Sequence, residues 1–149
     1  MWFEAVSSSS AGKDGPLSIG YAESNDGITW LIKGPGGEGV TAGAVFGPAG
    51  GAVFDAHSVG YPSVVHDPGD AAAPWKLWYE AGNRAVDVQN SLGYATSGNG
   101  LIWTRSSLPI LNPSSDARIP LSIDSGDIKH PCAYIDTSLP ANTKSHFLL

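Results

Sequence analysis

The sequence predicts an all-β fold of short strands joined by turns, and two observations support this prediction. First, the 149 residues include 19 Gly and 11 Pro, spread between short apolar and aromatic runs. This distribution is typical of a chain with many strands and many turns. Second, no segment shows the apolar spacing of an amphipathic helix. The length allows an ordinary domain with a real core.

An internal repeat organises the other predictions. The sequence WFEA at residues 2–5 returns as WYEA at residues 78–81, and IGYAESNDGITW at 19–30 returns as LGYATSGNGLIW at 92–103. A third anchor, DAHSVGYP, begins at Asp55, and its counterpart DSGDIKHP begins at Asp124. Three anchors in the same order argue against chance similarity, and repeats must be interpreted before single residues.

One complete period predicts four strands. The first, 62–66, is a short apolar run, and the second, 75–81, is rich in the aromatic residues that suit a pleated surface. The third, 91–96, alternates in side-chain size, and the fourth, 101–105, follows a tight turn. We expect Asn-Gly in that turn to supply the positive φ angles of a two-residue hairpin, as Asp-Gly does in the other copy.

A four-stranded antiparallel meander that recurs at a fixed period is typical of a β-propeller blade, because each small sheet must stack on neighbours to bury both faces. The predicted division is the end of one blade at 1–33, an inter-blade loop at 34–56, a complete blade at 57–106, a second loop at 107–126 and the start of another blade at 127–149. We expect Trp30, Trp78 and Trp103 to pack between blades.

Both ends of the chain align inside the second strand of a period. Met1 aligns with Leu77, and residues 146–149 align with 76–79. We therefore expect about two periods of a longer polypeptide, with the remaining blades as partners, because two blades alone leave sheet faces and edges exposed.

Composition argues against several classes of partner and cofactor. A net charge of −6 with eight Lys and Arg argues against nucleic acid, and no apolar run is long enough to cross a bilayer. Cys132 is the single cysteine, and no Cys/His spacing indicates a metal site. We expect no cofactor, and the sequence leaves the cellular location open.

The motifs within the repeat resemble a known superfamily. The sequence PSVVHD at 62–67, KLWYEA at 76–81 and LGYATSGNGLIWT at 92–104 are similar to the repeat of the five-bladed β-propeller glycosidases. That group includes arabinanases, xylosidases, invertases, levansucrases and mannosyl-phosphorylase relatives. The resemblance covers essentially the whole chain. It implies a funnel at the propeller axis, lined by the first strand of each blade, where carboxylates cleave a glycosidic bond.

The chain departs from this family at one informative position. Many members carry an acidic residue immediately before the Pro of the inner strand, but Tyr61 and His130 stand there. Either the catalytic carboxylates lie in other blades, or nearby acids supply them, or the protein is no hydrolase. A non-catalytic carbohydrate-binding propeller and a structural propeller module are therefore the alternatives.

Three aspartates are the candidate catalytic residues. Asp127 is the first candidate because its counterpart in the repeat is Ser58, and catalytic residues normally break repeat symmetry. Asp55 and Asp124 follow, although a repeated Asp that caps a turn would explain both without chemistry. The repeated Glu4 and Glu80 are interpreted as framework residues, since buried carboxylates need partners.

Four side chains on or beside the inner strands are candidate substrate-binding residues: His57, Tyr61, His130 and Tyr134. Such residues combine an apolar body with a polar tip, which suits the alternating surfaces of a sugar. The alternative for the two histidines is a loop or core imidazole that is satisfied by a local partner.

Two further segments are interpreted as loop chemistry. Residues 24–30 resemble a sialidase Asp-box shortened by one residue, and we interpret the segment as a hairpin turn. The glycine-rich stretch 34–51 lacks the Gly-Lys-Ser/Thr of a phosphate loop, so we interpret it as a long inter-blade loop.

Overall fold

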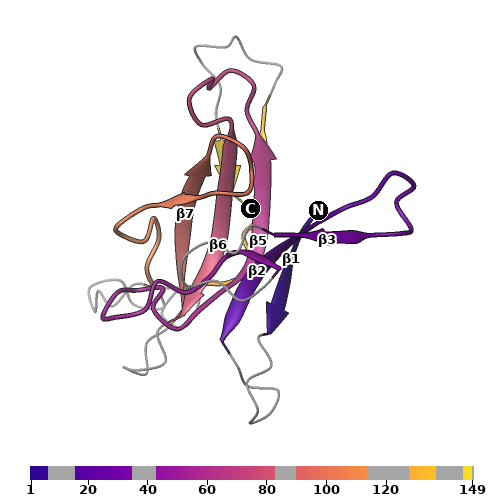
Figure 1. Cartoon of the computed structure of the whole chain (residues 1–149). Helices are drawn as coiled ribbons and strands as arrows, with labels where there is room; N and C mark the ends of the chain where they lie inside the picture. The colour runs from indigo at the N-terminus through magenta and orange to yellow at the C-terminus, as the bar shows by residue number, and fades with distance from the viewer. Residues whose placement is uncertain (7–15, 35–42, 83–89, 114–127, 137–145, 149) are drawn as a thin grey trace.

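A computed structural model describes residues 1–6, 16–34, 43–82, 90–113, 128–136 and 146–148. In these residues the chain forms ten strands and no helix, which confirms the all-β prediction (Figure 1). No helix that could cross a membrane is therefore found in this part of the chain. The strands are β1 (Trp2–Val6), β2 (Leu17–Glu23), β3 (Leu31–Lys33), β4 (Ala44–Phe46), β5 (Ser58–His66), β6 (Trp75–Gly82), β7 (Ser91–Ser97), β8 (Thr104–Arg105), β9 (Ala133–Ile135) and β10 (His146–Leu148).

The second sheet is the four-stranded antiparallel meander that the repeat predicts. Its order is β5-β6-β7-β8, so each strand pairs with the next along the chain. The strand β5 begins four residues earlier than predicted, at Ser58, and β8 begins only at Thr104. The fourth strand is shorter because Leu101 and Ile102 donate their backbone N–H groups to the turn residue Asn99 rather than to β7.

The first sheet contains a strand where the sequence predicted a loop. Its order is β1-β2-β3, and β4 also pairs with β2, at the part of β2 that β3 leaves unpaired. All three residues of β4 are buried, and the Phe46 ring packs edge-on against Tyr79 with centroids 4.9 Å apart. Burial of this apolar segment therefore stabilises a strand at residues 44–46, within the predicted loop 34–56.

The third sheet consists of the antiparallel pair β9 and β10. His146 lies opposite Ile135, as Trp75 lies opposite His66 in the second sheet. The sequence alignment, which placed His146 at Lys76, is therefore wrong by one residue, because strand register rather than residue type sets the equivalence. The described residues show one complete sheet beside two partial ones and do not include a closed ring.

The strand β5 joins the three sheets. It contacts β1 and β2 on one side and β9 on the other, and the Ala133 N–H donates to Ser63 Oγ over 2.8 Å. The core lies between the first and second sheets and is formed by Ile19, Val45, Phe46, Val59, Leu77, Tyr79, Ala81 and Ala95. Stacking of neighbouring sheets thus buries the apolar faces, as expected for blades.

An aromatic ring over a glycine explains part of the repeat. Phe3 pairs with Gly20 across the first sheet, and Tyr79 pairs with Gly93 across the second. A Cβ atom added to either glycine would overlap the ring of its partner. Glycine is therefore required on the third strand of each period because the ring occupies the space of the missing side chain.

A cross-strand aromatic pair explains another part. Trp2 faces Tyr21 in the first sheet, and Trp78 faces Tyr94 in the second, with ring centroids 4.9 and 5.2 Å apart. Such pairs stabilise a sheet by roughly 0.2–1 kcal/mol each. The repeated Trp-aromatic-Glu-Ala and Gly-Tyr-Ala motifs thus lie on two neighbouring strands, and their side chains pack against each other.

Candidate functional site

Two of the predicted substrate-binding residues come together. The rings of Tyr61, in β5, and His130, just before β9, lie 4.1 Å apart between centroids at an interplanar angle of 58°. Both side chains are exposed. They come from equivalent positions of neighbouring sheets, so the repeat itself places them side by side. An exposed phenol beside an exposed imidazole offers apolar faces and hydrogen-bonding groups in one place.

The backbone at both residues is in the left-handed region. Tyr61 has φ 47° and His130 has φ 55°, which is uncommon for residues other than glycine. The pairing of β5 with β6 shifts register between Gly60 and Ser63, so Tyr61 lies in a β-bulge. Bulges redirect side chains near functional sites, and here the same unusual conformation recurs at the same position of the repeat.

A glutamate from the preceding sheet holds the bulge at Tyr61. Glu4 Oε2 accepts a hydrogen bond from the Tyr61 backbone N–H over 3.1 Å. A Cβ atom on Gly60 would collide with this carboxylate, so the glycine leaves the space that Glu4 fills. The contact crosses from β1 to β5 and favours the framework interpretation of the repeated Glu.

Glu80 occupies the equivalent place toward the third sheet, but its surroundings differ. Its Oε1 accepts from Asn90 Nδ2 over 2.7 Å, while Oε2 is buried without a hydrogen bond of ordinary geometry among the described residues. Burial raises the pKa of Glu80, and the charge of Lys129 and the backbone N–H of His130 oppose that increase. Lys129 stands where the first copy has Gly60, a difference that sequence comparison showed but did not connect to Glu80.

The candidate catalytic residue Asp55 lies in the core. Its side chain is 1% exposed, and Oδ2 accepts from the Tyr79 hydroxyl over 2.9 Å and pairs with Arg105. The Arg105 guanidinium also lies over the Phe46 ring and donates to the Gly47 carbonyl over 2.8 Å. Burial and the Asp55 charge raise the pKa of Tyr79. These contacts favour a structural role for Asp55, as a buried partner of Arg105, over a role as an accessible acid. They also differ from the alternative that the sequence suggested, in which Asp55 caps a turn.

The remaining candidate residues are Asp124, Asp127, His57 and Tyr134. Asp124 and Asp127 lie outside the described residues, so their catalytic role stays a prediction. His57 immediately precedes β5, is partly buried, and its backbone N–H donates to the Gly82 carbonyl over 3.0 Å. Tyr134 lies in β9 with 45% of its surface exposed.

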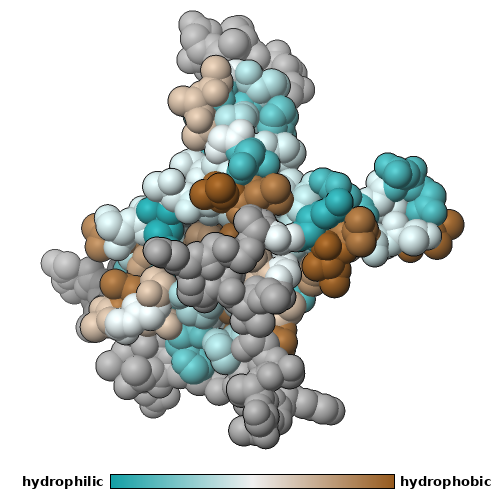
Figure 2. Space-filling view, in the orientation of Figure 1, coloured by the Kyte–Doolittle hydropathy of each residue, from teal (hydrophilic) through white to brown (hydrophobic). Residues whose placement is uncertain are grey.

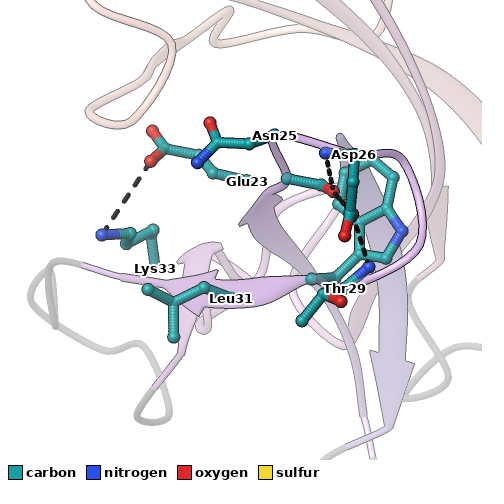
Figure 3. Close-up of a pocket in the computed structure, with 8 residues that line it drawn as sticks. Glu23, Asn25, Asp26, Thr29, Leu31 and Lys33 are labelled. Atoms are coloured by element: carbon teal, nitrogen blue, oxygen red, sulfur yellow. Dashed lines mark hydrogen bonds and ion pairs between the residues drawn. The ribbon is translucent and has the colours of Figure 1, made fainter.

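A pocket of about 490 Å³ lies on the hairpin between β2 and β3, and none of the residues that line it is a catalytic candidate from the sequence (Figure 3). It is lined by Glu23, Ser24, Asn25, Asp26, Thr29, Trp30, Leu31 and Lys33. Lys33 Nζ and Glu23 Oε2 are 3.9 Å apart at its edge. The interpretation of this segment as a turn motif did not foresee a concave surface on it.

The turn in this hairpin uses side chains rather than two positive φ angles. Asp26 Oδ1 accepts the backbone N–H groups of Ile28 and Thr29, and these bonds lower the pKa of Asp26. Asn99 accepts from the two equivalent residues of the second sheet. Only Gly27 and Gly100 have positive φ there. Turn chemistry is thus confirmed, but the two-residue hairpin is wrong, because an Asx side chain organises a longer turn.

No protein-family model matches the sequence, and no curated protein matches it. Among the described residues, no three His, Cys, Asp or Glu side chains are grouped as ligands for a metal ion.

Proposed function

We propose that the chain is part of a glycoside hydrolase-like β-propeller that acts on the glycosidic bonds of oligo- or polysaccharides. The observation that supports this proposal is the exposed pair of Tyr61 and His130 on neighbouring sheets. A pyranose ring has an apolar face and a rim of hydroxyl groups, which match an aromatic face and the polar tips of phenol and imidazole. In the proposed propeller, these two residues line the entrance to the axis.

Cleavage of a glycosidic bond needs two carboxyl groups. One protonates the leaving oxygen, and the other attacks the sugar or activates water, with their separation deciding between retention and inversion. We assign these roles to Asp127 and Asp124, because Asp55 is already engaged with Arg105 and Tyr79. The remaining blades of the polypeptide are the proposed structural partners.

A non-catalytic carbohydrate-binding propeller is the second candidate. It is favoured by Tyr61 and His130 standing where many of the propeller glycosidases that the sequence resembles carry an acid, and by the burial of Asp55. A structural module is the third. The candidates differ in two measurable properties, which are binding of a glycan and turnover of a glycoside.

Binding of a panel of oligosaccharides, followed by calorimetry, tests the shared part of the first two candidates. Tyr61→Ala and His130→Ala should each lower the affinity about tenfold, equivalent to ~1.4 kcal/mol. Leu108→Ala is the control, because Leu108 is 71% exposed and follows β8 rather than lying in β5 or beside β9. A folded protein that binds no member of the panel would contradict both candidates.

Turnover of aryl glycosides separates the enzyme from the binder. Asp127→Asn should abolish turnover while glycan binding remains. Glycan binding without turnover in the full-length polypeptide with all its blades would support the second candidate, and unchanged turnover in Asp127→Asn of that polypeptide would remove Asp127 from the mechanism.

A further inference from the structure

The hairpin of the first sheet, residues 24–31, presents an apolar surface to solvent. Ile28 is 84% exposed, Leu31 is 61% exposed and Trp30 is 42% exposed. The adjoining Ile32 is 61% exposed as well. In Figure 2 the arm that projects from the body at the right, where Figure 1 shows β3, carries brown, apolar surface near its base and again at its tip, with white and teal surface between them. This arm carries more apolar surface than a solvated turn needs.

The equivalent hairpin of the second sheet, residues 97–104, has the same kind of surface and holds a tryptophan on it. Trp2 of the first sheet donates its indole N–H to the Gly100 carbonyl over 2.9 Å. Its ring packs on Trp75 and meets Trp103 edge-on, with centroids 5.1 and 6.4 Å away. A Cβ atom on Gly100 would lie only 3.0 Å from Trp2 Cζ2. Glycine at this position therefore lets the turn approach the indole closely.

The first hairpin has the same turn in the same arrangement and a tryptophan equivalent to Trp103, but no described residue corresponds to Trp75. Gly27 has φ 73° where Gly100 has φ 74°, and Trp30 corresponds to Trp103. Ser24 Oγ accepts the Gly27 N–H over 2.8 Å, as Ser97 Oγ accepts the Gly100 N–H over 2.9 Å. The backbone of the docking surface is therefore formed before anything occupies it.

The two hairpins differ in which indole uses the glycine carbonyl. In the first, the Gly27 carbonyl accepts from the hairpin's own Trp30 Nε1 over 3.2 Å. In the second, Trp2 takes that acceptor, and the buried Trp103 Nε1 has no hydrogen-bond partner among the described residues. Trp30 thus occupies an acceptor that an incoming indole takes in the other copy.

We propose that the first hairpin is a docking site for a tryptophan carried on the second strand of another β-blade of this repeat type. The indole N–H of that blade binds the Gly27 carbonyl and displaces the Trp30 N–H. Its ring packs on Trp30, as Trp2 packs on Trp103. The occupant follows from the interface between the first and second sheets, which the same motifs form within this chain. This inference rests on the stacking of blades and not on carbohydrate chemistry.

A chain extended by one blade tests the proposal. A further copy of residues 57–113 is placed ahead of Met1 through a flexible linker, so that its own copy of Trp78 is the incoming tryptophan. Docking should raise Tm by about 5 °C, shift the Trp30 indole resonance and protect Trp30 from acrylamide quenching. Trp78→Ala in the added blade alone should reverse all three effects. Ile102→Ala in the added blade is the matched control and should reverse none, because Ile102 is 69% exposed.

A titration of the unmodified chain with N-acetyl-tryptophanamide tests the site without relying on the added blade to fold. The Trp30 indole resonance should move before those of Trp2 and Trp103, and Leu31→Asp should weaken the response. An unperturbed Trp30 in this titration would overturn the proposal, and so would a folded added blade that leaves Trp30 exposed.

Sedimentation of the unmodified chain examines the other occupant. A dimer that dissociates in Leu31→Asp but persists in Trp78→Ala would show that a second copy covers the hairpin without using its tryptophan, which would overturn the proposed partner. A monomer at all concentrations is the expected result.

Discussion

The first and second sheets carry the same motifs, yet their aromatic residues are used differently. Trp30 and Trp103 follow the same turn, but Trp30 is exposed and bonded to its own hairpin, whereas Trp103 packs beside a tryptophan from the other sheet. The turns themselves are nearly identical. The difference teaches that local sequence determines the turn, while the neighbouring sheet determines what the aromatic side chains do.

The largest effect expected from this comparison is at the tryptophan that crosses between sheets. Trp2→Ala should lower the free energy of unfolding by about 3 kcal/mol, the lower end for loss of a packed tryptophan, because Trp2 is partly exposed. It also leaves the Gly100 carbonyl without its indole donor. Urea unfolding measures the change.

Trp30→Ala is the matched control for that substitution. Because Trp30 is 42% exposed and, among the described residues, its indole donates to its own turn, its loss should cost less than about 1 kcal/mol. Equal losses for the two substitutions would contradict the distinction between a docked and an undocked hairpin.

A smaller effect is expected where the second sheet has a hydroxyl that the first lacks. Tyr79 occupies the position of Phe3 and donates to the buried Asp55 carboxylate. Tyr79→Phe should cost about 1–2 kcal/mol, because a buried acceptor loses its donor. Tyr21→Phe removes only an exposed hydrogen bond to Glu23 and should be nearly neutral. Thermal unfolding of both variants checks the order.

The smallest effect is a difference in acid sensitivity between the two turns. The pKa of Asp26 is lowered in the folded chain, so the ionised form stabilises its turn above the unfolded pKa of about 3.9. That stabilisation is lost as the pH falls through the folded pKa. Asn99 does not ionise, so acid should move the backbone amide resonances of Ile28 and Thr29 but spare their counterparts in the second turn.

Asp26→Asn makes the first turn chemically like the second and should remove this acid response. Amide shifts of Ile28 and Thr29 that still follow the pH in this variant would assign the titration to another group.

The sequence predicted the complete sheet well, because strand patterns and turn residues are local signals. The Asp26 and Asn99 turns and the strands around Trp78 are found where the repeat predicted them. The strand at Ala44–Phe46 was missed because its three residues owe their order to burial against the second sheet, including the contact of Phe46 with Tyr79. Such a contact is non-local and leaves no periodic pattern in so short a segment.

The candidate site was predicted only in part for the same reason. The repeat placed Tyr61 and His130 at equivalent positions, but their contact and positive φ angles depend on how neighbouring sheets stack. Asp55 looked like a turn residue or an acid, because its partner Arg105 lies far along the chain. The sequence did contain a signal for Glu80: Lys129, whose charge acts on Glu80, stands where the first copy has Gly60.

The ring over the glycine has a consequence for how such a chain evolves. Tyr79 and Gly93 share one space, so a side chain at the glycine is tolerated only when the ring opposite becomes smaller. The same holds for Phe3 and Gly20. Each aromatic-glycine pair is thus inherited as a unit. Duplication of a whole period keeps both residues of the pair, whereas a single substitution at the glycine makes its new side chain clash with the ring. Covariation between these two positions, rather than conservation of either one, is the record expected in a lineage of such repeats.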